Sequence, residues 1–493
     1  MAPHGVGRAG SPTKPAALAL ASALLVAALV GVPAPAGAAT VEVAIGDNVF
    51  LPQVVHVEPG DTVRWVHRGF RTHTVTSDTG LFDSGDLHGG DAYSFTFTKE
   101  GVYVYHCRHH GAPGKVGQWG QVVVGTPDDG TDQEVIEVPG DFPTIQQAVD
   151  QARPGAHILV APGTYREMVT VSTEGLVIRG GDRFRAVLQG DDRLETGFLV
   201  TADGVTIEDL TVRNFRRAGI AFRGVEGFAV LRVDLIKNRT YGVVATGSSE
   251  GVIRRSFGWG SGDSAFRVED CFPCGVLLDR VTARTNVMGY AGQNATGVVI
   301  LDSVFAGNGV GVVPSTLPGP AGLSGQGTLL LGNRLRANND ATVPVAGFAA
   351  QHGLLFGTGI WLLGSSNAVA RGNRIAGHER YGVLVSAGVD PAVKPANNEV
   401  VGNTVTDSGL YALAWDGAGA DNCFEGNEVT GPTGPSDLQV AFRCSARPFQ
   451  GSAFAAVRDD VRQALASGPP PGQREPPEPR RPSCQRGRPG CHR

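Results

Sequence analysis

The feature that most constrains the fold is a unit of about 24 residues that recurs through most of the chain. Apolar residues alternate within each unit, and the unit ends in Asn. The recurring Asn residues form one series at Asn214, Asn238, Asn286 and Asn308 and a second at Asn333, Asn373, Asn403 and Asn427. A unit this short has no room for a helix, and its inward residues can be buried only against neighbouring units. The repeat therefore predicts a parallel β-helix over residues 134–446.

The corners of such coils explain two further features of the sequence. Asn tolerates left-handed backbone conformation and can stack its amide on the next coil, so we expect the Asn residues at turns. Gly supplies 70 of the 493 residues, about twice the usual ~7 %, which excludes a helix-rich protein and suits coil corners. The longer spacings, 333 to 373 and 373 to 403, predict inserted loops.

The composition also limits the class of protein. Hydrophobic residues make up 41 % of the chain and charged residues 18 %, which is enough apolar material for a core and argues against global disorder. The formal net charge of -5 lacks the basic excess that neutralises phosphates, so we expect no nucleic-acid partner.

The first 39 residues are typical of an export signal. Arg8 and Lys14 precede an apolar run at 16–32, and a small-residue cleavage site ends at Ala38. A membrane anchor is the alternative, but the run is short and is followed by Pro33. We therefore predict a signal peptide at 1–39, cleaved near Ala38, and a secreted mature chain without a transmembrane segment.

Residues 40–125 have the pattern of an all-β sandwich. Short alternating strands are predicted at 41–45, 54–57, 62–66, 93–97, 102–105 and 121–124, with turn residues between them. An acidic, Gly-containing linker at 126–133 follows this segment. At the other end of the chain, 447–493 is predicted to form a short helix and a Pro/Arg-rich tail.

A cluster of metal-ligand residues lies within the predicted sandwich. Cys107 is followed three residues later by His110, and His73 lies 34 residues before Cys107. One thiolate and two imidazoles hold copper in both oxidation states, whereas a zinc site would need a second Cys that this segment lacks. His106 and His109 compete with His110 for one ligand position.

These motifs closely resemble the plastocyanin/azurin family of blue-copper proteins, the cupredoxins. The resemblance covers residues 40–125 and implies a cupredoxin Greek-key β-sandwich holding one type 1 copper ion for single-electron transfer. By position it makes His73, Cys107 and His110 the equatorial ligands. Gln118 stands where the family usually has an axial Met, so Gln118 either binds through its amide oxygen or leaves the copper three-coordinate. The redox partner is not specified.

The repeat region resembles the right-handed parallel β-helix proteins of the pectate-lyase-like group, including the NosD type. The predicted cap around Thr144, the strand and turn through Tyr165 and the Gly-Asn pairs carry this resemblance. The fold hosts lyases, hydrolases, epimerases and non-catalytic binders, so it leaves the chemistry open. Candidate acidic and basic residues are Asp263, Glu269, Asp270, Asp279, Asp302, Arg254, Arg255 and Arg267. The favoured interpretation of the charged residues is that they keep the exposed coil faces soluble. Trp259 and Tyr290 are candidates for stacking on sugars and can equally serve packing.

Six of the seven cysteines follow residue 270 and can pair. The simplest pairs are Cys271 with Cys274, Cys423 with Cys444, and Cys484 with Cys491. For the first pair, a structural disulfide is favoured over a redox motif because no helix is expected to follow it. This pairing leaves Cys107 as the single free thiol.

The sequence therefore supports three hypotheses. The preferred one is a secreted copper protein for electron transfer whose β-helix binds a partner or a polysaccharide. The second is a carbohydrate-active enzyme in which the β-helix is catalytic and the copper domain accessory. The third is copper storage or delivery without electron transfer.

Overall fold

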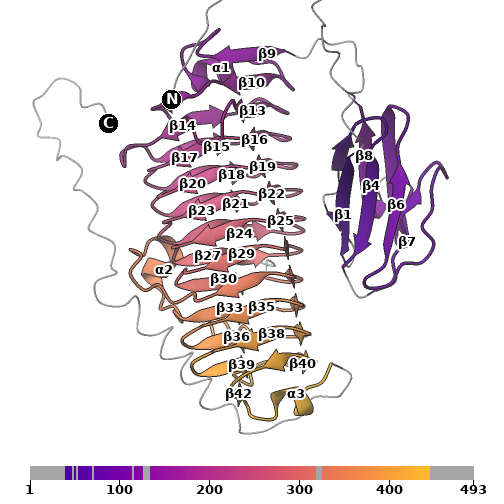
Figure 1. Cartoon of the computed structure of the whole chain (residues 1–493), viewed down its shortest axis with the longest axis vertical. Coiled ribbons are helices and arrows are strands. Elements are labelled where there is room, and N and C mark those ends of the chain that lie inside the picture. Colours follow the sequence, from indigo (N-terminus) through magenta and orange to yellow (C-terminus); the bar gives the residue numbers. More distant parts are fainter. Residues whose placement is uncertain are drawn as a thin grey trace, which may run out of the picture. The chain divides into compact units, whose positions relative to one another are not determined.

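A computed structural model describes residues 39–46, 49–51, 54–68, 71–113, 116–125, 134–317 and 325–444. The predicted signal peptide, except its last residue, lies outside these ranges, as do the linker, the helix and tail at 447–493 and the pair Cys484 and Cys491. The described part is nearly all β and comprises a small sandwich and a long β-solenoid (Figure 1). Among the described helices, none has the length and apolarity that a membrane crossing requires.

The sandwich consists of two four-stranded sheets. One has the order β2, β1, β4, β6 and the other β3, β8, β7, β5. The strands are β1 Thr40–Gly46, β2 Val49–Leu51, β3 Val54–Val57, β4 Thr62–His67, β5 Thr76–Ser77, β6 Ala92–Thr96, β7 Gly101–Ala112 and β8 Val116–Val124. Their inward side chains, with Trp65 and Tyr105 at the centre, form one core. All six expected strands are present, and the short β2 and β5 are additional.

The solenoid is built from three parallel sheets, and each full coil adds one strand to each sheet (Figure 1). Sheet I contains β9 Val135–Val138, β10 His157–Val160, β13 Val177–Gly180, β16 Thr206–Glu208, β19 Ala229–Leu231, β22 Val252–Arg254, β25 Leu277–Asp279, β28 Val299–Leu301, β31 Leu329–Leu331, β34 Val369–Arg371, β37 Glu399–Val401 and β40 Cys423–Glu425.

Sheet II contains β11 Gly163–Tyr165, β14 Ala186–Gln189, β17 Thr211–Arg213, β20 Asp234–Ile236, β23 Phe257–Trp259, β26 Thr282–Arg284, β29 Val304–Ala306, β32 Arg334–Arg336, β35 Arg374–Ala376, β38 Thr404–Thr406 and β41 Glu428–Val429. Sheet III contains β12 Val169–Val171, β15 Thr196–Val200, β18 Ala218–Arg223, β21 Tyr241–Thr246, β24 Ser264–Cys271, β27 Met288–Ala295, β30 Val310–Ser315, β33 Thr358–Leu363, β36 Tyr381–Ser386, β39 Tyr411–Trp415 and β42 Thr433–Gly434.

A short helix covers each end of the solenoid. At the first coil, α1 Ile145–Gln151 begins at Thr144, whose side chain accepts a hydrogen bond from the backbone amide of Gln147. This is the cap that the sequence predicts. At the last coil, α3 Leu438–Ala441 packs against β40 and was not predicted from the sequence. Both helices bury apolar side chains against the open end of the core.

The Asn residues form buried ladders along the coil corners. In the ladder Asn333, Asn373, Asn403 and Asn427, each side-chain oxygen accepts hydrogen bonds from the backbone and side-chain nitrogens of the preceding member. A second ladder runs through Asn286, Asn308 and Asn338 and ends on His378. Each coil is thus hydrogen-bonded to the next inside the core.

Two details of the predicted corners are corrected. The residue before the ladder Asn, not the Asn itself, takes the left-handed conformation, as at Gly372 with φ 64°. Asn214 is instead such a left-handed residue, with φ 60°. The next residue, Phe215, donates its backbone amide to the side chain of Asn238 and so occupies the inward corner position. Ser261 occupies the corner of the coil that lacks an Asn.

The longest spacing in the second Asn series corresponds to an insertion, as predicted. Residues 339–357, which include α2 Gly347–Gln351, cover the outer face of sheet III at β30, β33 and β36. Asp263, directly before β24 of sheet III, accepts a hydrogen bond from the backbone amide of Phe348 at 2.7 Å. This carboxylate fastens the insertion to the sheet.

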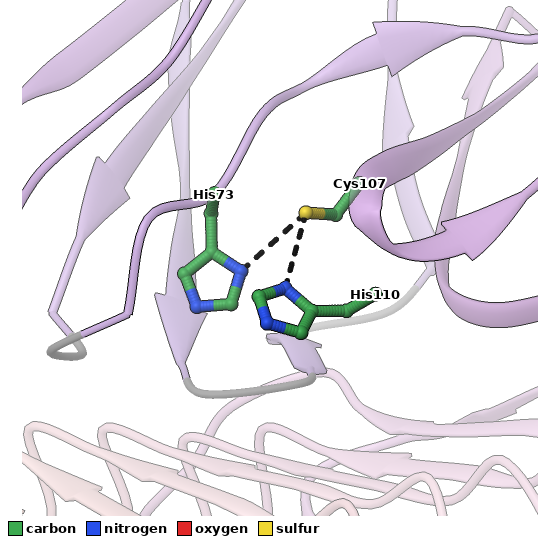
Figure 2. Close-up of side chains that lie close together, drawn as sticks. All are labelled: His73, Cys107 and His110. Carbon is green, nitrogen blue, oxygen red and sulfur yellow. Dashed lines mark hydrogen bonds between the residues drawn. The ribbon is translucent and has the colours of Figure 1, made fainter.

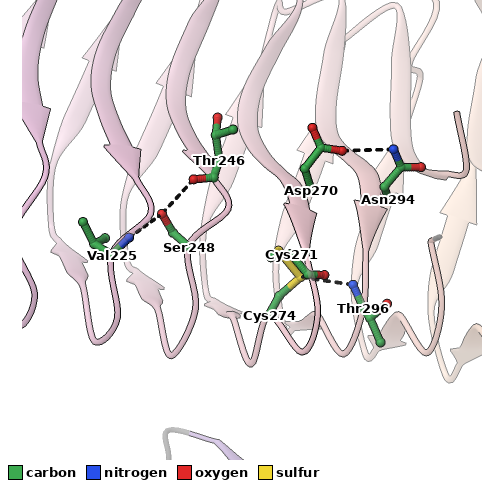
Figure 3. The surroundings of a disulfide bond; sticks show 8 residues. All are labelled: Val225, Thr246, Ser248, Asp270, Cys271, Cys274, Asn294 and Thr296. Atoms are coloured by element: carbon green, nitrogen blue, oxygen red, sulfur yellow. Dashed lines mark hydrogen bonds between the residues drawn. A yellow bond between two sulfur atoms is a disulfide. The ribbon is translucent and has the colours of Figure 1, made fainter. Parts of the chain in front are cut away.

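Two predicted disulfides are present, Cys271–Cys274 and Cys423–Cys444. Cys271–Cys274 closes a corner between sheet III and sheet I (Figure 3). The sulfur of Cys274 accepts a hydrogen bond from the backbone amide of Thr296 in the next coil, whereas the hydroxyl of Ser248 accepts one from the backbone amide of Val225 in the preceding coil. Because both half-cystines are buried in a β corner, the geometry is that of a structural disulfide.

Candidate metal centre

The centre is built on an irregularity in the longest strand of the sandwich. Strand β7 pairs regularly with β8 up to His106 opposite Trp119, and pairing resumes at Gly111 opposite Gly117. The residues between His106 and Gly111 outnumber those facing them, so this part of β7 bulges. Cys107 and His110 both lie in the bulge. The local shift in register is what turns their side chains toward one point.

Three predicted ligands meet there (Figure 2). The sulfur of Cys107 lies 3.6 Å from Nδ1 of His73 and 3.4 Å from Nδ1 of His110. One ligand atom from each residue lies within 4.8 Å of the others, and the rings of His73 and His110 are 4.6 Å apart between centroids. The structure thus converges one sulfur and two imidazole nitrogens, a set that fits copper.

The site favours the thiolate form of Cys107. Burial acts to raise the pKa of the thiol, but hydrogen bonding from His73 and from the backbone amide of Thr74 opposes it. With a further bond from His110, the net effect lowers the pKa of Cys107 to about 6. The thiolate is the form that ligates metals.

Thr74 joins the two chain segments that supply the ligands. Its backbone amide donates to the sulfur of Cys107 at 3.4 Å, and its hydroxyl accepts a hydrogen bond from the backbone amide of Arg108 at 2.9 Å. Thr74 is not among the residues predicted for the site, although it directly follows the predicted ligand His73. Thr74 therefore holds His73 and Cys107 in register.

We expect Thr74→Val to lower the free energy of unfolding of the copper-free sandwich by about 1–2 kcal/mol, because the Arg108 amide loses its acceptor. The measurement is calorimetry of the full chain. The sandwich's unfolding transition is identified as the one whose temperature rises when copper is added. Thr76→Val is the matched control, since Thr76 only donates to Thr74 and Asp83. Equal effects of the two substitutions would contradict the role given to Thr74.

The two competing imidazoles are engaged elsewhere. Nδ1 of His106 lies 2.7 Å from a carboxylate oxygen of Asp78, and Nε2 of His109 lies 2.8 Å from one of Asp86. Within the described residues, the only His, Cys, Asp and Glu cluster with metal-binding geometry is His73, Cys107 and His110. The geometry therefore selects His110 among the three histidines of this strand.

Gln118 lies in β8 and is 2 % exposed. Its position between Gly117 and Trp119 places it across from the bulge of β7. Its side-chain nitrogen donates to the backbone carbonyl of Gly46 at 3.2 Å. Axial coordination would use the other end of the amide, Oε1.

The candidate acids of the solenoid serve mainly as ion-pair partners. Asp263 and Glu269 both bind Arg267, and Asp279 binds Arg254 and Arg280. Asp270 accepts a hydrogen bond from Asn294. Of the predicted stacking residues, Tyr290 is 0 % exposed and packs in the core, whereas Trp259 is partly exposed. The carboxylates on this list thus have structural partners, and Asp302 lies close enough to Arg280 for its charge to help raise the pKa of that guanidinium.

Comparison with known families agrees with both halves of this description. Residues 38–125 match the model for copper binding proteins of the plastocyanin/azurin family, and residues 192–436 match the right handed beta helix region. Amicyanin from Paracoccus denitrificans is 41 % identical over 61 residues, which are 11 % of this chain and 47 % of amicyanin. The chain thus spans about half the length of this curated relative.

Solved structures resemble each half separately. A methionine-to-glutamine mutant of amicyanin in its Cu(I) form is 34 % identical, with 17 % of this chain and 82 % of that chain covered and a TM-score of 0.16. The A-module of a mannuronan C-5 epimerase from Azotobacter vinelandii is 16 % identical, with 62 % and 87 % covered and a TM-score of 0.45. On the evidence of the two family matches, the chain joins a copper-binding domain of the plastocyanin/azurin family to a right-handed β-helix domain.

Proposed function

We propose that the sandwich binds one copper ion as a type 1 centre, through His73, Cys107 and His110, and passes single electrons in an exported protein whose β-helix holds a partner. The observation that carries the proposal is the convergence of the three donor atoms within 4.8 Å. Copper supplies the one-electron couple when bound. A thiolate with two imidazoles suits both of its oxidation states.

The surroundings of the donors support rapid electron transfer. Cys107 and His73 are fully buried, and the strands that carry them pack on the sandwich core. The Thr74 hydrogen bonds tie the two segments together before any metal arrives. A framework fixed in this way limits the change in ligand geometry when the charge at the centre changes.

One ligand also provides a path for electron transfer between the copper centre and the protein surface. His110 is the one partly exposed residue among the three ligands, so its ring edge offers the shortest path from the centre to a redox partner. Storage or delivery would instead require the ligands to release the ion readily. Voltammetry of the copper-loaded full chain separates these functions: a reversible one-electron wave is expected, and loss of copper on reduction would favour delivery.

Gln118 provides a test of the axial position. We expect Gln118→Met to raise the reduction potential, because a thioether favours Cu(I) more than an amide oxygen does. Gln121→Met makes the same replacement in the same strand and is expected to leave the potential unchanged. The readout is the midpoint potential of each copper-loaded variant. An unchanged potential in Gln118→Met would show that Gln118 is not an axial ligand.

A further inference from the structure

Six large apolar side chains lie on the outward face of sheet I, and we call them the sheet I patch. The residues that alternate with them, such as Leu278, Ile300 and Leu330, belong to the solenoid core, so the six point away from it. They form a cluster of their own, separate from that core. The patch consists of Leu277, Val299, Leu301, Leu329, Leu331 and Val369, on β25, β28, β31 and β34.

The patch is buried, although one face of a sheet on a solenoid's surface is normally open to solvent. Its members are between 2 % and 7 % exposed. Other outward-facing apolar residues of sheet I, such as Leu159, Val177 and Val252, are only partly buried. Neighbours within the sheet are therefore not enough to exclude water at these positions. Another part of the chain must cover the four strands of the patch.

The insertion at 339–357 does not supply this cover, because it packs on the outer face of sheet III. A contiguous outward-facing apolar surface is typical of an interface between folded parts. The patch is therefore best explained as a docking surface for a part of the chain outside the solenoid's coils.

The sandwich has a face with the same property. Ala44 of β1 and Val66 of β4 are paired neighbours that point away from the sandwich core, since Ile45 and Trp65 beside them belong to it. Both are nevertheless buried, at 4 % and 6 % exposed. Ala92 of β6, which pairs with Val66 on its other side, is exposed. The cover over this sheet therefore reaches β1 and β4 but not β6.

The sandwich is tethered to the same sheet that carries the patch. The segment 126–133 joins it to β9, the first strand of sheet I, and eight residues span at most about 28 Å. Six strand spacings separate β9 from β25, which is about 29 Å. The near end of the patch is thus within reach, and a short tether gives the sandwich a high effective concentration there.

We propose that the outer face of β1 and β4 docks on the sheet I patch, so that the sandwich and the solenoid form one body. Charged residues border both faces, Glu42 with Arg64 on the sandwich and Asp279 with Arg254 on the solenoid. An apolar centre with a polar rim is the usual anatomy of a protein interface. Docking holds the metal centre at a fixed position on the solenoid. The inference does not depend on which metal binds there.

Carbene footprinting of the full chain tests this docking, because the reagent labels side chains that solvent reaches. Leu301→Asp/Leu331→Asp places two carboxylates in the patch, where their burial is unfavourable. We expect labelling of the sandwich segments 41–45 and 62–67 to rise at least about threefold, since Ala44 and Val66 become accessible as other outward-facing strand residues are. The radius of gyration from small-angle scattering should rise as well.

Leu159→Asp/Val177→Asp is the matched control, because it makes comparable replacements on the same sheet outside the patch. It should change neither the labelling of the sandwich nor the radius of gyration. Ala44→Asp is the reciprocal variant and leaves the solenoid unaltered. It is expected to raise the labelling of the patch strands β28 and β31, and it keeps the test decisive if the doubly substituted solenoid does not fold.

Four outcomes overturn the proposal. They are unchanged sandwich labelling in the patch variant with unchanged patch labelling in Ala44→Asp, equal changes in the control, increased labelling confined to 318–324 or 447–493, and a patch that becomes exposed only when a dimer dissociates on dilution. Cys107→Ser, which removes the proposed copper thiolate, should give the labelling pattern of the unaltered chain. A failure of the copper proposal is therefore visible separately from a failure of this one.

Discussion

Asn373→Ala is expected to lower the free energy of unfolding of the solenoid by about 3–6 kcal/mol. Oδ1 of Asn373 accepts from both nitrogens of Asn333, and Nδ2 donates to the carbonyl of Leu330 and to Asn403. Alanine removes all four buried hydrogen bonds, each worth about 0.5–1.5 kcal/mol, and leaves the backbone amide of Asn333 without its acceptor, which costs about 1–3 kcal/mol. The measurement is calorimetry of the full chain. The solenoid's unfolding transition is identified as the one whose temperature does not change when copper is added.

Asn397→Gly is the matched control for this prediction. Asn397 is exposed and has φ 54°. It precedes the buried Asn398, which donates to the side chain of Asn422 in the next coil as Asn373 donates to Asn403. Glycine adopts the left-handed conformation without strain, so we expect a change below about 1 kcal/mol. Similar losses for the two substitutions would mean that the ladder is not a main source of the solenoid's stability.

His378→Asn is expected to remove an acid-dependent loss of stability. His378 ends the second ladder, where its Nε2 accepts from Nδ2 of Asn338 at 3.0 Å. Burial lowers the pKa of His378 to about 4, from a value of about 6.5 in the unfolded chain. Between these values the unfolded state binds more protons, so stability falls as pH falls from about 6.5 to about 4. The full difference is worth about 3 kcal/mol.

Asparagine can accept the same hydrogen bond from Asn338 and does not titrate in this range. The stability of His378→Asn relative to the unaltered chain should therefore rise between about pH 7 and about pH 4, by about 3 kcal/mol. Urea unfolding across this range measures the difference. A constant difference across the range would contradict the burial of a neutral imidazole at this corner.

The solenoid was largely predictable because each coil repeats one short rule. Apolar alternation gave the strands, and the Asn series located the corners of the coils. Asn214 was misassigned because it lies in a left-handed position one residue ahead of the inward corner position, and sequence spacing alone does not separate two adjacent corner positions. The insertion at 339–357 was visible as a gap, but its attachment through Asp263 depends on residues 85 apart in the chain.

The metal centre was predictable for a different reason. The ligand types and their spacing identify Cys107, His73 and His110, and the structure brings these three together. The role of Thr74 was not predictable from residue type, because Thr is common in strands and only the contact with Arg108 reveals its function.

The most direct test of the central claim is the visible absorption and paramagnetic resonance spectrum of the copper-loaded full chain, compared with Cys107→Ser. We predict one Cu(II) per chain, with the strong visible band of a thiolate–Cu(II) bond and a matching paramagnetic signal. The substitution should abolish the band. Bound Cu(II) without such a band, or an unchanged band in Cys107→Ser, would contradict a copper centre ligated by Cys107.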